Sequence, residues 1–167
     1  MKLPEKLSHY KSKRMLLLVS GKQEMLIYTL KDAEIEERKH FRIENPTYSD
    51  NEGHFKVRTG GKVMRSGSVR ETDDREIIVK FKNEIASNLD EIKQTFDEVY
   101  ISAPGKTKNE ILEALPIDIK EKVTKTIVGN YCSLSPIEIL DLFSEEEEDE
   151  IQEAEVRKIL KKNNQVT

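Results

Sequence analysis

The first part of the chain carries apolar residues in the patterns of three consecutive strands. Residues 15–20 form a continuous apolar run typical of a buried strand, and residues 25–30 form a second run after a short polar turn. Residues 33–43 then alternate between apolar and charged positions, as a half-exposed strand does. The apolar positions of this third strand, which we expect on one face, are Ile35, Phe41 and Ile43. The pattern predicts a three-stranded meander.

From residue 73 the apolar spacing changes to three and four, which predicts a long amphipathic helix with Asp73 as its N-cap. The recurring apolar positions are Ile77, Ile78, Phe81, Ile85, Leu89, Ile92 and Phe96. Residues 98–103 are β-branched or aromatic in large part and predict a strand. One or two short helices are expected after it, followed by a fifth strand at 125–131.

The sequence Ser-Pro-Ile-Glu at 135–138 combines a capping box with proline at the first helical position, which predicts a helix through Phe143. A chain of 167 residues fits one domain. We therefore expect an α/β domain at 15–143, with a mixed sheet of about five strands and flanking helices, after a basic N-terminal extension at 1–14. Residues 144–167 run from acidic to basic, which suits a helix macrodipole and predicts a charged helix or tail that a protein partner could bind.

Composition favours no particular partner. Hydrophobic and charged residues each make up 36% of the chain, and the net charge is only −4, so any charge-based function must come from local patterning. Cys132 is the only cysteine, which excludes an intramolecular disulfide, fits a reducing compartment and is expected as a structural thiol. The basic extension is followed by only five apolar residues, too few for a signal-peptide core or a membrane span. We expect a cytoplasmic protein that does not span a membrane.

Residues 45–72 follow neither pattern and predict a long loop, which contains four of the seven glycines. Its part from residue 53 to residue 70 carries five Lys and Arg residues and no Asp or Glu. The five are Lys56, Arg58, Lys62, Arg65 and Arg70. Such a segment can follow a phosphate backbone with salt-dependent, sequence-independent affinity, and Gly60 and Gly61 permit close approach of the backbone. Composition leaves a second interpretation open, a basic loop that serves solubility alone.

Few residues offer catalytic or metal-binding chemistry. Three dispersed His residues and one Cys lack the spacing of zinc ligands, so no metal is expected. The run Gly60-Gly61-Lys62 lacks the first glycine and the final Ser or Thr of a Walker loop, so no nucleotide cofactor is expected either. Carboxylates in the early strands would suit a metal-dependent nuclease only if the fold made them converge. These residues are Glu24, Glu34, Glu36 and Glu37.

Element order and motifs together resemble the middle domain of archaeal and eukaryotic peptide-chain release factors. The resemblance covers residues 15–143 and rests on Arg-Thr-Gly-Gly-Lys at 58–62, the basic stretch and long helix that follow, and Phe-Asp-Glu-Val-Tyr-Ile-Ser-Ala-Pro at 96–104. Three further segments are similar to the bacterial branch, many of whose members are named host-attachment proteins; they lie at 111–115, 119–123 and 134–139.

The resemblance implies a ribonuclease-H-like fold and a functional loop. In release factors this loop carries a Gly-Gly-Gln tripeptide into the peptidyl transferase centre, where it helps water to attack the peptidyl-tRNA ester. Gly60 and Gly61 match the two glycines, and Lys62 stands in place of the glutamine. A backbone N–H at the third position survives this change, but the glutamine amide does not. The sequence leaves ribosome-dependent hydrolysis open and assigns no catalysis to the chain alone.

Three functions compete at this point. The first is a ribosome- or RNA-associated factor in translation release, rescue or dormancy, in which the basic loop contacts ribosomal RNA or tRNA. The second, implied by the name of the bacterial branch, is an interaction protein linked to host-cell or surface attachment, without catalysis. The third is a nuclease built on converging carboxylates.

Overall fold

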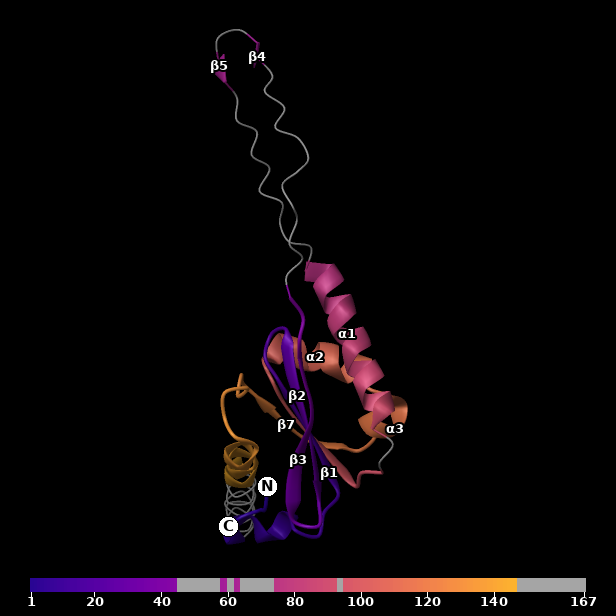
Figure 1. Ribbon diagram of the computed structural model, residues 1–167, viewed down its shortest axis with the longest axis vertical. Helices are drawn as coiled ribbons and strands as arrows, with labels where there is room; N and C mark the ends of the chain where they lie inside the picture. The colour runs from indigo at the N-terminus through magenta and orange to yellow at the C-terminus, as the bar shows by residue number, and fades with distance from the viewer. Residues whose placement is uncertain (45–57, 60–61, 64–73, 93–94, 147–167) are drawn as a thin grey trace, which may run out of the picture.

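The protein is a mixed five-stranded sheet with helices on both faces, as expected from the sequence. The computed structural model describes residues 1–44, 58–59, 62–63, 74–92 and 95–146. The sheet has the strand order β3-β2-β1-β6-β7 (Figure 1). Its strands are β1 (Met15–Ser20), β2 (Glu24–Lys31), β3 (Glu34–Arg42), β6 (Glu98–Ala103) and β7 (Val123–Val128). Strands β1, β2 and β3 form the predicted antiparallel meander, while β6 runs parallel to both β1 and β7.

Two apolar layers, one on each face of the sheet, make up the core. On one face lie α1 (Asp74–Glu91), α2 (Gly105–Ala114) and α3 (Ile117–Lys120), which bury side chains such as Phe81, Ile85 and Ile111. The other face is covered by the short 3₁₀ helix η1 (Glu5–Tyr10) and by a helix at 136–146 (Figure 1). All six residues of β1 are buried because this strand is central and covered on both sides.

Two element boundaries differ from the expectation. The long helix ends at Glu91, so Phe96 is not helical; it is buried from the segment that leads into β6. The fifth strand begins at Val123, two residues earlier than expected, and ends at Val128. The strand at 98–103 lies where the sequence predicts it, and the two short helices after it are α2 and α3.

Strand β3 contains a β-bulge that overturns a prediction about its faces. Its register against β2 shifts by one residue at Arg38, so side chains beyond this point switch to the other face of the sheet. Ile35 packs in the layer beneath the helix at 136–146, whereas Phe41 and Ile43 pack against the layer beneath α1. The prediction that these three side chains share one face is wrong, because a pattern of period two does not reveal an inserted residue.

The residues before β1 contribute to the core. Leu3, Leu7 and Tyr10 are buried against the same face as the helix at 136–146. The backbone N–H of Leu3 donates to the carbonyl of Ala33 at 2.9 Å, which joins the N-terminal residues to the edge of the sheet beside β3. The spacing of these three residues, four and then three, is that of one helical face, a signal that the interpretation of residues 1–14 as a basic extension did not use.

The helix at 136–146 begins with the predicted capping box. The backbone N–H of Ser135 donates to Oε2 of Glu138 at 2.7 Å, and the N–H of Glu138 donates to Oγ of Ser135 at 3.3 Å. These two bonds satisfy donors that a helix N-terminus otherwise leaves unpaired. The remainder of the predicted C-terminal helix or tail, residues 147–167, lies outside the described residues.

Candidate functional site

The segment that the sequence assigns to a loop contains a small hairpin. Strand β4 (Arg58–Thr59) pairs antiparallel with β5 (Lys62–Val63) in a sheet separate from the main one. Arg58 lies opposite Val63, and Thr59 lies opposite Lys62. The two residues that join the strands in sequence are glycines, the residue type that two-residue hairpin turns favour. The structure therefore adds strand pairing to the Gly-Gly-Lys motif.

The candidate RNA-binding residues divide into two groups. Arg58 and Lys62 belong to paired strands, so the structure brings their backbones together. The other five candidates lie outside the described residues; they are Lys56, Gly60, Gly61, Arg65 and Arg70. Their contacts with RNA stay a prediction.

The residues that flank the segment at 45–73 lie at one edge of the main sheet, the edge formed by the ends of its strands and not by the side of β3. Strand β3 ends at Arg42, and the N–H of Ile43 donates to the carbonyl of Gln23 at 2.8 Å. The other end enters α1 at Asp74, which shares a small cavity of about 50 Å³ with Gln23. The parallel strands β1 and β6 also reach their carboxyl ends at this edge. Ligand sites of open α/β sheets usually lie at such an edge.

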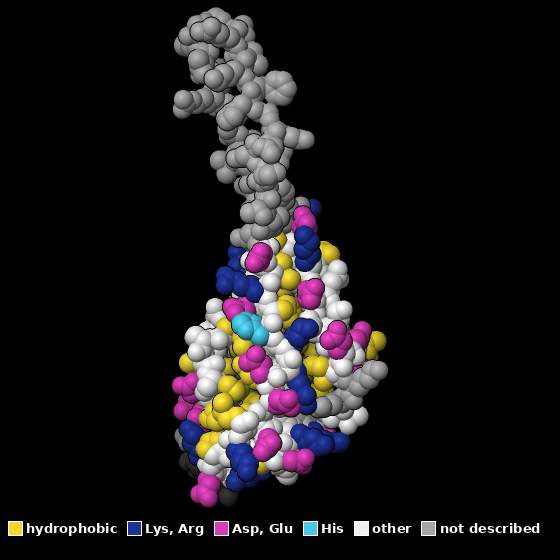
Figure 2. All heavy atoms as spheres, in the orientation of Figure 1, with side chains coloured by type: hydrophobic (Ala, Val, Ile, Leu, Met, Phe, Trp, Pro, Cys, Tyr) yellow, Lys and Arg dark blue, Asp and Glu magenta, His cyan; other side chains and the backbone are white. Residues whose placement is uncertain are grey.

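The body beside this edge has no excess of positive charge. The same cavity is lined by the cations Lys22 and Lys106 and by the carboxylates Asp74 and Glu110. Over the visible face of the molecule, blue and magenta side chains are interspersed (Figure 2). The cationic bias is therefore a property of the sequence at 53–70 and not of the sheet and helices that carry it.

Cys132 lies near a Glu–His pair, but its environment does not activate it. Burial, and then the charge of Glu24, raise the pKa of the Cys132 thiol to about 11. Nε2 of His40 is 2.7 Å from Oε1 of Glu24, so the imidazole already has a carboxylate partner. A thiol with a raised pKa is a poor nucleophile at neutral pH. This agrees with the expected structural thiol.

Three of the four carboxylates considered for a nuclease site have separate partners. Glu24 pairs with His40, and Glu36 lies 3.0 Å from the Arg38 guanidinium. Glu37 bonds to Tyr28, whose pKa rises to about 12 mainly because of burial and then because of this carboxylate. Within the described residues, no group of three or more His, Cys, Asp or Glu side chains is arranged to hold a metal ion. The structure thus gives the nuclease interpretation no converging site.

Comparisons with known proteins identify similar folds only. No protein-family model and no curated protein sequence matches the chain. Pelota from Archaeoglobus fulgidus matches with a TM-score of 0.47 and 14% identity, over 91% of this chain and 40% of that one. An archaeal translation termination factor, aRF1, matches with 0.43 and 13%, over 84% of this chain and 41% of that one.

A third match is Dom34 from S. cerevisiae, described as a translation termination-like factor involved in RNA quality control that interacts with Hbs1. Its TM-score is 0.44 and its identity is 10%, over 74% of this chain and 31% of that one. The chain thus spans less than half the length of each of these proteins. With TM-scores below 0.5, the matches assign no role to any residue here. Separately, no helix in the described part of the chain is long and apolar enough to cross a membrane.

Proposed function

We propose that this protein is a ribosome- or RNA-associated factor in translation release, rescue or dormancy, and that the hairpin β4–β5 is its RNA-contacting element. One observation carries the proposal: Arg58 and Lys62 lie in paired strands joined by Gly60-Gly61. By their descriptions, aRF1 acts in translation termination and Dom34 in RNA quality control, which is consistent with the proposal but carries no weight in it.

Strand pairing explains why a hairpin suits this role. Pairing sets the backbone positions of Arg58 and Lys62 on two neighbouring strands, and the alternation of faces along a strand assigns them to opposite faces of the hairpin, so we expect each cation to contact a different phosphate. Lysine and arginine side chains neutralise phosphates and release counterions, which gives affinity that falls steeply with salt. Gly60 and Gly61 carry no side chain, so we expect the backbone between the two strands to approach RNA or the acceptor end of tRNA closely.

Hydrolysis of peptidyl-tRNA is the finer part of the proposal. Lys62 supplies a backbone N–H and an ammonium where release factors have a glutamine, so the chain keeps a donor for a developing oxyanion but loses the amide. A Lys ammonium prefers a phosphate or a carbonyl as its partner. We therefore expect any hydrolysis to depend on the ribosome. Membership of the bacterial host-attachment branch and binding of a partner by residues 144–167 stay predictions.

Co-sedimentation with purified ribosomes across a salt series tests the proposal. The wild type should bind at low salt and dissociate as salt rises, with a log–log slope that reflects the number of phosphates contacted. Lys62→Ala with Arg65→Ala should weaken binding and lower the slope by about 2. Deletion of residues 53–70 should abolish binding.

A charge-matched control separates the hairpin from general electrostatics. Lys31→Ala with Lys39→Ala removes the same charge from exposed positions of β2 and β3. This control should retain the wild-type salt slope. Equal losses in the two double variants would show that net charge alone drives binding, and unchanged binding in the deletion variant would refute the proposal.

A further inference from the structure

The N-terminus of α2 presents backbone N–H groups that the helix itself does not use. Strand β6 ends at Ala103, Pro104 is the N-cap, and α2 begins at Gly105. The first hydrogen bond of the helix runs from the N–H of Lys108 to the carbonyl of Pro104 at 2.9 Å. The N–H groups of the three residues before Lys108 therefore have no carbonyl partner within the helix. The N-cap side chain forms no cap bond and the first turn holds no acidic residue, so nothing in this turn compensates the positive end of the helix dipole.

Thr107, in the same turn, adds a buried hydroxyl without a partner. The residue is 4% exposed, and its hydroxyl makes no hydrogen bond with any residue that the structure describes. Among the described residues, the one side-chain oxygen that is both sealed from solvent and unpaired belongs to Ser102. The Thr107 hydroxyl is therefore not sealed, and the cavity of about 50 Å³ that Thr107 lines is the space it reaches. A buried hydroxyl without a protein partner is free to donate to a bound group.

Two lysines bring positive charge to the same cavity. Lys106 is the second residue of α2, and Lys22 lies in the turn between β1 and β2. Neither ammonium group forms an ion pair within the part of the chain that the structure describes. The carboxylates of Asp74 and Glu110 line the cavity as well, so these four charges balance. The uncharged donors of α2 therefore favour an anion where charge alone favours no ligand.

These donors fit one phosphate group. Backbone N–H groups at a helix N-terminus, a hydroxyl and a lysine ammonium are groups by which proteins hold phosphate. The order Gly105-Lys106-Thr107 matches the last three positions of a Walker loop, but Tyr100 stands where that loop has its first glycine. Only Pro104 joins β6 to α2, so no loop encloses a chain of phosphates. The cavity is also far below the roughly 300–1,000 Å³ of small-molecule sites, so we expect a single phosphate group and not a whole nucleotide.

Gly105 leaves the approach to these donors open. Among the described residues, a Cβ at this position would meet only the Val128 side chain, at 3.7 Å, and Val128 is itself 60% exposed. We propose that the first turn of α2, together with Lys22, binds one phosphate group, either free or from an RNA backbone. The RNA source rests on the proposed function, because the residues that flank the segment at 45–73 lie at the same edge of the sheet.

Backbone amide NMR of the full chain tests the proposal with two probes. Inorganic phosphate at constant pH should shift the amide signals of Gly105, Lys106 and Thr107 saturably, with half-saturation at about 1–10 mM. Sodium chloride at the same ionic strength should leave these signals in place. The second probe is a pentamer of uridine without terminal phosphates, which offers backbone phosphates alone. Shifts at a lower concentration of RNA than of phosphate would assign the site to RNA, and shifts with phosphate alone would assign it to a free phosphate group.

Four variants connect binding to the named side chains. Thr107→Val nearly keeps the shape of the side chain and loses the hydroxyl, so it should weaken phosphate binding about tenfold, whereas Thr107→Ser should restore most of the affinity. Lys106→Ala should weaken binding, while Lys108→Ala should not, because residues two apart do not share a helix face. Glu110→Gln is expected to strengthen binding, since it removes a negative charge from the cavity.

The wild-type titrations decide the question even if a variant unfolds. Equal shifts with phosphate and chloride, or no shift of the three amide signals at about 50 mM phosphate, would overturn the proposal. Deletion of residues 53–70 should leave the response to inorganic phosphate unchanged. The failure of the hairpin as an RNA-contacting element can therefore be distinguished from the failure of this site.

Discussion

Replacement of Tyr10 by alanine should destabilise the whole domain. Tyr10 is fully buried at the end of η1, and its ring lies edge-on to that of Tyr100 in β6, with centroids 6.0 Å apart. Tyr100 in turn contacts Phe143 of the helix at 136–146, with centroids 4.8 Å apart. One aromatic cluster therefore joins the N-terminal residues, the sheet and the last described helix.

The size of the effect follows from the area that the ring buries. An aromatic side chain removes about 150–250 Å² from water, which corresponds to roughly 4–6 kcal/mol at about 25 cal/mol per Å². Part of this remains with alanine, and measured aromatic-to-alanine changes in cores are about 3–5 kcal/mol. For a domain of this size, we expect Tyr10→Ala to lower the Tm by about 8–15 °C.

Urea unfolding with matched variants tests this prediction. Tyr10→Phe keeps the ring and removes the phenol oxygen, which accepts a hydrogen bond from the Ser144 hydroxyl at 3.3 Å, so it should cost about 1 kcal/mol. Lys11→Ala, at the exposed neighbouring position, should cost less than about 0.5 kcal/mol. If Tyr10→Ala stays within about 1 kcal/mol of the wild type at an unchanged m-value, residues 1–10 do not belong to the cooperative unit and the reasoning fails.

Three further predictions concern other parts of the fold. The thiol pKa of Cys132 is raised to about 11, so little reactive thiolate is present at mildly alkaline pH. Under these conditions Cys132 should react with iodoacetamide about 100-fold more slowly in the folded protein than in the urea-unfolded chain. Equal rates would contradict the raised pKa. Ser135→Ala should cost about 1 kcal/mol in urea unfolding through loss of the helix cap. The pKa of Glu138 is lowered by the backbone hydrogen bond from Ser135, so the charged carboxylate stabilises the fold at neutral pH and this stabilisation is lost as pH falls through the lowered pKa. The difference in free energy of unfolding between the wild type and Glu138→Gln should therefore disappear over the same pH range. A difference that does not depend on pH would contradict this cause.

Sequence patterns predict those elements of this fold that depend only on residues close together in the sequence. The strand at 98–103 and the capping box at Ser135 are confirmed because β-branched composition and helix capping are local properties. The faces of β3 could not be predicted, since one inserted residue leaves the alternation intact on either side of it. Leu3, Leu7 and Tyr10 have the spacing of one helical face, but three apolar positions in a basic segment do not reveal that the segment packs on the assembled sheet.

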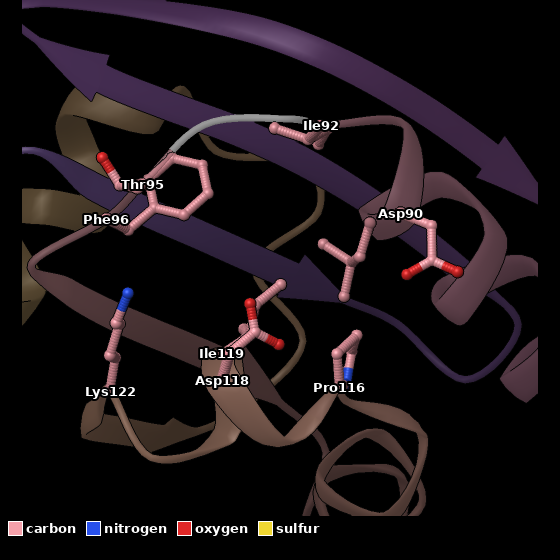
Figure 3. Close-up of a pocket in the computed structure, with 9 residues that line it drawn as sticks. Asp90, Ile92, Thr95, Phe96, Pro116, Asp118, Ile119 and Lys122 are labelled. Atoms are coloured by element: carbon pink, nitrogen blue, oxygen red, sulfur yellow. The ribbon is translucent and has the colours of Figure 1, made fainter.

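The candidate site likewise combines features that the sequence predicts with features that only the structure shows. The basic composition of residues 53–70 can be read directly, but the pairing of Arg58 with Val63 depends on the order of the residues around Gly60-Gly61, which composition does not contain. A pocket lined by Phe96 and Ile119 (Figure 3) has no sequence signal, because its described lining comes from α1, α3 and the residues before β6. Chemistry carried by one segment can therefore be predicted, whereas chemistry assembled from several segments requires the fold.

The arrangement of the scaffold makes deletion of residues 53–70 a fair test of function. The residues that flank the segment at 45–73 lie close together, because Ile43 bonds to Gln23 and Asp74 lines the same cavity as Gln23. Because the entropy of closing a connecting segment depends only logarithmically on its length, removing these residues should change the free energy of unfolding by no more than about 1 kcal/mol. The described core contacts, including those of Phe81 and Ile85, all lie outside the deleted residues. Loss of ribosome binding at an unchanged urea midpoint would therefore report the contacts of the hairpin itself. A fall of several kcal/mol in the free energy of unfolding would show that the segment belongs to the fold and that the deletion cannot separate binding from stability.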